Sequence, residues 1–302
     1  MSRRDVAIAG AGVLLAAALA VLPYLGVVGQ LPWASDSLVW ITRGMPDDPG
    51  WWDWVLHTRH FIAWRPLTAL SFVVDGWLVG ARDPRVYLVT NLVLHTLGGV
   101  LAWLCFRRWT GDRGAWGLLA VLVVLGHPVS DDVVTVVARR SYLLSLDLGL
   151  VALIAHRGAL DRPAWSLMSG VALWLAVLGH EQAVVLLPVL AMLGLASAPW
   201  RSALSACVSP AALVGAALVG RARVLGGWFG GYDERWFASL DPSGRPIAER
   251  LESVDPVAIG SSALRYLLDP HGPVGLAPLL PGALARGLAL SLVVAAAAAL
   301  QE

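Results

Sequence analysis

Ionisable and amide side chains recur at the ends of apolar runs through the first two thirds of the chain. They are Asp36, Arg65, Asn91, His95, His127, Asp132, Arg140, His180 and Glu181. An ionisable group beside hydrocarbon is costly, and it is kept mainly where it faces a cavity, a partner or a substrate. Guanidinium groups bind phosphate, carboxylates act as general bases, and imidazoles do either kind of work. The question is therefore whether these groups meet at one site.

Each of these residues also has a simpler interpretation when it is taken alone. Asp36 could be a general base, a metal ligand or a sugar-orienting group, but Asp and Ser are also common helix N-caps. Arg65, followed by Pro66 at the expected start of a helix, could bind phosphate or could reach the membrane surface with its charged tip. Asn91 and His95 share one helix face at i, i+4 spacing, where they line a site or hydrogen-bond another helix.

The remaining groups lie in two short segments. His127 closes an apolar run, Asp132 follows it and Arg140 leads into the next run, so this segment offers phosphate ligands or a self-contained salt bridge. His180 and Glu181 separate two further runs. Their spacing matches no local metal motif, so the sequence predicts no fixed metal site and gives only weak support for a divalent ion.

The composition indicates a polytopic membrane protein. Of the 302 residues, 57% are hydrophobic and only 14% are charged, against roughly 25% charged residues in soluble domains. The net charge of +1 gives no argument for a nucleic-acid partner. Cys105 and Cys207 lie in apolar segments and are expected to be small buried hydrophobic residues.

Apolar runs predict an all-α bundle of about seven or eight spans in a single domain over residues 1–302. The runs are Val6–Val28, Val86–Phe106, Trp116–Gly126, Leu143–Ala155, Trp165–Leu178, Ala183–Ala198, Ala203–Gly220 and Leu276–Leu300. The first is long enough to be a retained span, which needs roughly 20 residues. The last ends abruptly at Gln301 and Glu302, from which we expect a chain truncated at its C-terminus.

Arginines near short loops predict the orientation. Arg3–Arg4, Arg107–Arg108 with Arg113, Arg157 with Arg162, and Arg201 fall at alternate ends of the runs, which should be cytoplasmic. Two long loops, at residues 29–85 and 221–273, would then face outward and carry interfacial helices, one of them at Trp51–Trp54. The polar groups named above would all lie on the outward side.

The motifs resemble those of a known family. They are Trp64-Arg65-Pro66-Leu67-Thr68-Ala69-Leu70-Ser71-Phe72, Tyr87-Leu88-Val89-Thr90-Asn91-Leu92-Val93-Leu94-His95, His127-Pro128-Val129 with Asp132 and Arg140 downstream, and Gly179-His180-Glu181-Gln182-Ala183-Val184. Their order and spacing resemble the multi-span O-mannosyltransferase-like proteins of the GT-C glycosyltransferase class. These include bacterial relatives and the animal members with tetratricopeptide repeats. The resemblance covers roughly residues 31–190.

The chain departs from the family pattern at four positions. Ser37 stands in place of the second acid after Asp36, Leu88 in place of a histidine, Tyr142 in place of an acid, and His180 in place of a lysine before Glu181. The missing acid weakens the case for a metal. The missing lysine removes a positive charge that His180 supplies only when it is protonated.

The resemblance implies a GT-C-like transmembrane bundle that uses a polyprenyl-phosphate-linked sugar as donor and a protein, glycan or lipid hydroxyl as acceptor. Asp36 would be the catalytic base. The other eight residues would bind substrate at the outer face of a bacterial inner membrane. The alternatives are a lipid or solute transporter and a non-catalytic scaffold of an envelope glycan pathway. Transporters place ionisable groups near the bilayer midplane, whereas here they cluster at one face.

Overall fold

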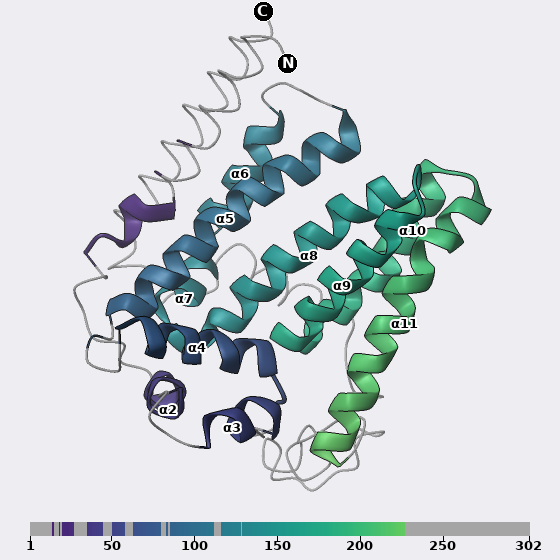
Figure 1. The fold of residues 1–302 in the computed structure, drawn as a ribbon. Helices are drawn as coiled ribbons and strands as arrows, with labels where there is room; N and C mark the ends of the chain where they lie inside the picture. The colour runs from purple at the N-terminus through teal and green to yellow at the C-terminus, as the bar shows by residue number, and fades with distance from the viewer. Residues whose placement is uncertain are drawn as a thin grey trace, which may run out of the picture.

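The computed structural model describes residues 14, 18, 20–26, 35–44, 50–57, 63–79, 83, 85–111, 116–127 and 129–226. Most of the first predicted span, the last predicted span and nearly all of the second predicted loop lie outside these residues. The described elements are helical, as the sequence predicts (Figure 1). They are η1 (Leu22–Tyr24), α2 (Ser35–Arg43), α3 (Trp51–His57), α4 (Pro66–Val79), α5 (Arg85–Thr110), α6 (Trp116–Gly126), α7 (Val129–Thr135), η2 (Val137–Arg139), α8 (Arg140–Ala159), α9 (Ala164–Gly179), η3 (Glu181–Val185), α10 (Leu186–Ser197) and α11 (Trp200–Leu225).

Two of the described helices, α5 and α11, are long and apolar enough to cross a membrane. Shorter apolar helices lie at Pro66–Leu78, Ala164–Gly179 and Glu181–Ser197. Large apolar side chains point away from the protein: Met192 is 70% exposed, Leu204 53% and Val208 64%. Such a surface suits lipid rather than water, because soluble monomers rarely expose extended apolar patches. The chain is a helical membrane protein, and the count of seven or eight spans stays a prediction.

The long helices run in two opposite directions. Asn91 of α5 bonds to Arg140 of α8 near the start of both helices, and Trp109 bonds to Leu153 further along both, so α5 and α8 run parallel. The helix α9 is antiparallel to α8, because Gly158 near the end of α8 faces Trp165 at the start of α9, and Gly179 at the end of α9 faces the start of α8. The helices α10 and α11 then follow the directions of α8 and α9 respectively. The start of α8 and the end of α9 therefore lie at the same end of the bundle.

Small residues allow the closest helix crossing. Gly170 of α9 faces α11 so tightly that an added Cβ would lie 2.8 Å from the Ser209 carbonyl carbon and 2.9 Å from the Pro210 nitrogen. Nearby, Ser166 donates a hydrogen bond to the Ala206 carbonyl oxygen at 2.9 Å. Backbone contact at a glycine and a hydroxyl-to-carbonyl bond are typical of helix packing in membranes. Together they fix the spacing of α9 and α11.

The first predicted loop is largely helical. It contains α2, α3 and α4, which cover one end of the bundle (Figure 1). Trp40 stacks on Phe72 with ring centroids 5.3 Å apart, and Phe72 stacks on Tyr87 at 5.8 Å. These rings join α2, α4 and α5 in one apolar cluster. The helix predicted at Trp51–Trp54 is present as α3, and its place at a membrane interface stays a prediction.

Candidate functional site

The end of the bundle covered by α2, α3 and α4 also holds most of the polar residues singled out by the sequence. It is formed by the starts of α5 and α8 and by the junction of α9 with η3. The predicted cytoplasmic arginines of α5, α8 and α11 lie at the opposite end, in the last turn of α5, the last turn of α8 and the first turn of α11. These arginines of the short connections lie away from the polar end, which carries Arg65, Arg139 and Arg140 of its own.

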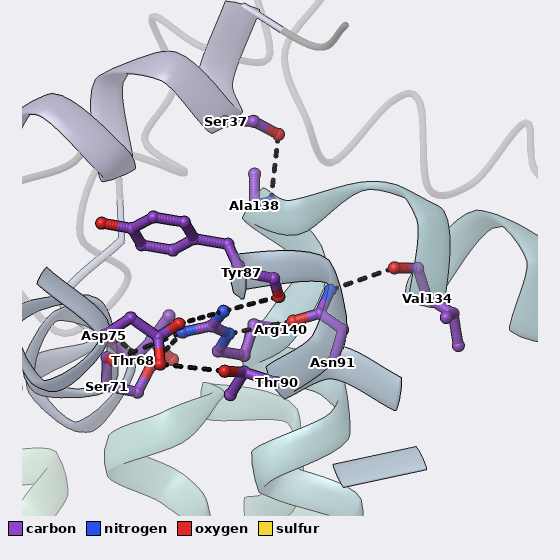
Figure 2. A network of polar contacts seen from close by, with 10 residues as sticks. All are labelled: Ser37, Thr68, Ser71, Asp75, Tyr87, Thr90, Asn91, Val134, Ala138 and Arg140. Carbon is purple, nitrogen blue, oxygen red and sulfur yellow. Dashed lines mark hydrogen bonds and ion pairs between the residues drawn. The ribbon is translucent and has the colours of Figure 1, made fainter. Parts of the chain in front are cut away.

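Arg140 is the most enclosed charge at the polar end (Figure 2). It is 0% exposed. Its Nε donates to Asn91 Oδ1 at 2.9 Å, its Nη1 to the Ser71 carbonyl and hydroxyl at 3.3 and 3.5 Å, and its Nη2 to the Tyr87 carbonyl at 2.9 Å. Nη2 also forms an ion pair with Asp75 Oδ2 at 2.7 Å. A guanidinium has five N–H groups. Each of its three nitrogens has a partner, so phosphate binding by Arg140 would require one of these contacts to be exchanged.

Asp75 is the residue that sequence reasoning missed. It lies on α4, its side chain is 4% exposed, and it neutralises Arg140. Its other oxygen accepts a hydrogen bond from the Thr90 hydroxyl at 2.9 Å (Figure 2). An acid at the end of an otherwise apolar run was a usable signal, because a charge in such a place needs a partner. The partner was not apparent because it lies far along the chain.

Asn91 joins this network to a further helix. Its side chain is fully buried, with Oδ1 bound to Arg140 and Nδ2 donating to the Val134 carbonyl of α7 at 3.1 Å. On the far side, the Ala138 N–H donates to the Ser37 hydroxyl of α2 at 3.2 Å (Figure 2). The start of α8 is therefore tied to α2, α4, α5 and α7.

A second, more accessible pair lies at the start of α4. Arg65 directly precedes Pro66, which suits the first position of a helix because its missing N–H is not needed there. The Arg65 guanidinium meets the Glu181 carboxylate in two bonds, Nη2–Oε1 at 2.9 Å and Nε–Oε2 at 3.1 Å. Their side chains are 16% and 18% exposed. One turn into α4, the Thr68 hydroxyl donates to the Gly179 carbonyl at 2.9 Å.

The Glu181 carboxyl is ionised because of this pair. Burial by itself raises its pKa, but the hydrogen bonds and positive charge of Arg65 outweigh burial and lower the pKa to about 2. Two-point binding to a guanidinium is among the stronger pairings available to a carboxylate. The pair fixes the orientation of Arg65 at a partly open position, where a phosphate could approach.

His180 lies between Gly179 and Glu181, and its ring is almost wholly buried at 2% exposure. It packs against the Tyr142 ring of α8 with centroids 4.2 Å apart. Burial, with a smaller contribution from the charge of Arg65, lowers the pKa of His180 to about 4. The imidazole is therefore neutral near pH 7. The positive charge considered for this position in the sequence is absent at that pH.

The other predicted site residues lie near this end in separate contacts. Asp132 of α7 forms an ion pair with Arg139 at 2.7 Å, the local salt bridge weighed from the sequence. The His127 carbonyl accepts from the Ser130 N–H at the start of α7. His95 is buried one turn deeper in α5, edge-on to Tyr24 with ring centroids 6.0 Å apart. Asp36 lies in the first turn of α2, and its side chain is outside the described residues.

Within the described part of the chain, no group of three or more His, Cys, Asp or Glu residues could hold a metal ion. The described polar chemistry is instead that of guanidinium, carboxylate, imidazole and hydroxyl groups. These can bind phosphate and sugar hydroxyls directly.

Two curated proteins resemble this chain. It is 29% identical to protein O-mannosyl-transferase tmtc2 of Xenopus laevis over 197 residues, which are 59% of this chain and 23% of that relative. It is 30% identical to protein O-mannosyl-transferase TMTC3 of Mus musculus over 98 residues, 32% of this chain and 10% of that relative. The chain spans less than a quarter of the length of either relative. No family model and no solved structure matches it.

The comparisons agree with the resemblance found in the motifs, which lie in the helices that build the polar end. The similarity is low and partial, so it establishes kinship rather than activity. The chain is a distant relative of the protein O-mannosyl-transferases.

Proposed function

We propose that the protein is an integral-membrane glycosyltransferase. It would move a sugar from a polyprenyl-phosphate-linked donor to an acceptor hydroxyl of a protein. The observation that carries the proposal is the Arg65–Glu181 pair, which holds a partly exposed guanidinium at the polar end of a membrane bundle. The relatives, both called protein O-mannosyl-transferases, support mannose as the first sugar to test.

In the proposed reaction, the acceptor oxygen attacks the anomeric carbon of the sugar. The bond from that carbon to the phosphate oxygen breaks, and polyprenyl phosphate leaves with the electron pair. The acceptor proton passes to the Asp36 carboxylate, which acts as general base. Attack opposite the leaving group inverts the configuration of the sugar. Asp36 stands at the start of α2, whose Ser37 contacts the segment before Arg140.

Arg65 would stabilise the phosphate as negative charge develops on it. Electrostatic stabilisation by groups held in place before reaction is often the largest part of catalysis. Glu181 holds Arg65 by two bonds, and the Asp75–Arg140 pair holds α4, on whose start Arg65 stands. We therefore assign Arg140, Asn91 and Asp75 to positioning, and His95, His127 and Asp132 to the surrounding substrate-binding end.

The reaction would take place at the outer face of a bacterial inner membrane. The arginines at the short connections opposite the polar end support this orientation, because positive residues near short loops favour the cytoplasmic side. The competing function is a non-catalytic membrane scaffold. The protein contacts at all three Arg140 nitrogens favour that alternative, since they leave one charge fewer for a substrate.

The test is transfer by the purified protein in lipid nanodiscs. Polyprenyl-phosphate [³H]mannose is the donor, and a Ser/Thr-containing peptide is the acceptor. We expect Asp36→Asn to abolish transfer and Arg65→Gln to lower it at least tenfold, a loss of about 1.4 kcal/mol or more of transition-state stabilisation. Asp161→Asn is the matched control, since Asp161 is an exposed carboxylate beyond the last turn of α8 at the opposite end.

Full activity of Asp36→Asn would remove Asp36 from the mechanism. Wild-type protein that binds the donor but transfers nothing to any acceptor offered would favour the scaffold. Movement of the lipid-linked sugar across the membrane of sealed proteoliposomes, without transfer, would favour the transporter. The elution profile of each purified variant separates loss of folding from loss of chemistry.

A further inference from the structure

His180 has a fixed tautomer. It ends α9 with an extended backbone, φ −154° and ψ 127°, and begins η3. Its Nδ1 accepts a hydrogen bond from the Gln182 N–H at 3.3 Å. A neutral imidazole has one donor nitrogen and one acceptor nitrogen. Because Nδ1 accepts, the proton is on Nε2, which is therefore a hydrogen-bond donor.

That donor is unsatisfied. Nε2 is shielded from solvent and has no hydrogen-bond partner among the described residues. Buried donors in folded proteins nearly always have partners, and an exception calls for an explanation. Leaving such a group unpaired destabilises the fold. A function that needs the donor is one reason for it to persist.

The surroundings of His180 keep it neutral. The charged and titratable groups facing it are Arg65 and Glu181, which are bound to each other, and Tyr142 of α8. Burial and the charge of Arg65 lower the pKa of His180 to about 4, so it stays an N–H donor from about pH 5 to pH 8. In the proposed site, Arg65 would supply the positive charge that faces the phosphate, and His180 would supply an uncharged N–H donor.

The Tyr142 ring covers one side of the His180 imidazole. It packs on the imidazole at 4.2 Å between centroids and a 35° interplanar angle. Unlike His180, Tyr142 is 40% exposed. Rotation of an exposed ring is a fast, local motion. Such a rotation would remove the Tyr142 ring from one side of His180 without separating α8 from α9.

We propose that His180 Nε2–H is a hydrogen-bond donor reserved for an oxygen of the lipid-linked sugar donor, and that the Tyr142 ring covers it until that substrate binds. This inference rests on the proposed function for the identity of the ligand. The oxygen belongs to the phosphate or to the sugar, and both present the same acceptor chemistry. No bond is made or broken at His180.

Two substitutions distinguish the roles of the two ring nitrogens of His180. The Asn side chain places an acceptor near the position of Nδ1 but does not reach Nε2. The Gln side chain places an N–H near Nε2 but not an acceptor near Nδ1. If His180 serves only to cap η3, His180→Asn is the milder change in every assay. If Nε2–H binds substrate, His180→Asn weakens binding about five- to tenfold, the worth of one hydrogen bond, while His180→Gln stays within about twofold.

Binding is measured with polyprenyl phosphate and, separately, with polyprenyl-phosphate mannose. Weaker binding of both lipids by His180→Asn assigns the donor to a phosphate oxygen. Weaker binding of the mannosyl lipid alone assigns it to a sugar oxygen. Equal binding by wild type and His180→Asn overturns the inference while leaving the transferase intact. Failure of the wild type to bind either lipid overturns the proposed function itself, so the two failures are distinct.

The cover is tested by chemical modification. Diethyl pyrocarbonate acylates accessible imidazoles, and mass spectrometry reports the extent at each histidine. We expect slow modification of His180 in the wild type, at least tenfold faster modification in Tyr142→Ala, and an unchanged rate in Leu146→Ala. Leu146 is the matched control, one turn further along α8 and also 40% exposed. Exposed His57 serves as the internal reference. An unchanged rate in Tyr142→Ala would show that Tyr142 is no cover.

Discussion

Arg140 illustrates how a charge is accommodated in an apolar interior. Taking one ion out of water costs several kcal/mol even after the protein relaxes. The chain offsets that cost with an opposite charge, Asp75, and with oxygen acceptors from Ser71, Tyr87 and Asn91. Removing one member leaves the other charge without compensation.

The first prediction concerns this pair. Asp75→Asn should destabilise the protein by about 3–5 kcal/mol, because Arg140 would remain buried without a counter-charge. The double variant Asp75→Leu, Arg140→Met removes both charges and should recover much of that loss. Chemical unfolding in detergent followed by tryptophan fluorescence measures both. A double variant that is less stable than Asp75→Asn would contradict this account.

The second prediction concerns pH. The pKa of His180 is lowered to about 4 in the folded protein from an ordinary 6.5, so its contribution to stability is complete above pH 6.5 and is lost as the pH falls toward 4. The pKa of Glu181 is lowered to about 2 from 4.5, so its contribution is lost between pH 4.5 and 2. We expect the thermal midpoint to fall through both windows.

Two variants test the assignment of these windows. His180→Asn should flatten the decline between pH 6.5 and 4 and leave the lower window unchanged. Glu181→Gln should flatten the decline between pH 4.5 and 2. Scanning calorimetry at constant ionic strength gives both profiles. A decline between pH 6.5 and 4 that persists in His180→Asn would assign that window to another group.

At this scale the sequence predicts residue types better than partners. The sequence singled out Arg65, Arg140 and Glu181 as candidate site residues, because charged side chains beside apolar runs are rare. Their pairings were not predictable: Arg65 and Glu181 are 116 residues apart, and periodicity within one helix carries no information about another. Asp75 was missed for the same reason, since its role depends on Arg140.

At the scale of elements, apolar runs predicted the long helices well. The run at Trp116–Gly126 coincides with α6, and α5, α8 and α11 extend a few residues beyond their runs, as α8 does from Leu143 back to Arg140. The run at Ala183–Ala198 is divided between η3 and α10, so its single predicted helix was wrong. Helices in a membrane satisfy their own backbone groups, so hydrophobicity alone locates them. The helix α4 lay in a predicted loop, because its 14 residues are too few for a span.

The third prediction concerns helix packing. Gly170→Ala should destabilise the protein by about 1–3 kcal/mol, because the new methyl group would meet the backbone of α11, which cannot rotate away. Gly215→Ala is the matched control, since nothing lies within 4 Å of its added Cβ. That change should be neutral or stabilising by up to about 1 kcal/mol, from helix propensity. If Gly170→Ala destabilised the protein no more than Gly215→Ala does, α9 and α11 would be able to move apart to accept the methyl group.

At the scale of the whole molecule, the arginines of the short connections lie at the end opposite the polar network, which holds Arg65, Arg139 and Arg140 in ion pairs. The sequence predicted this separation from charge and run length, without any knowledge of which helices touch. The parallel course of α5 and α8 brings it about in the structure, because it places Asn91 beside Arg140 at one end and Arg108 and Arg157 at the other. Which end faces the cytoplasm stays a prediction.

The fourth prediction tests that orientation. After Cys105 and Cys207 are replaced by alanine, a single cysteine at His57 should react with a membrane-impermeant maleimide in intact bacterial cells. A single cysteine at Arg162 should react only after the cells are permeabilised. Both positions are exposed and lie toward opposite ends of the bundle. The reverse pattern would place the polar end in the cytoplasm and would exclude an outward-facing site.

The long sequence separation of the paired residues at the polar end also affects the order in which this end can form during synthesis. Ser71 precedes Arg140 by 69 residues, and Arg65 precedes Glu181 by 116. At roughly 5–20 residues per second, a ribosome needs about 3–14 s to supply the first partner and about 6–23 s to supply the second. During that interval α4 can pack against α2 and α5, but Asp75 lacks Arg140 and Arg65 lacks Glu181. The polar end is therefore complete only after residue 181 has been synthesised, and until then its charges are not compensated by these partners.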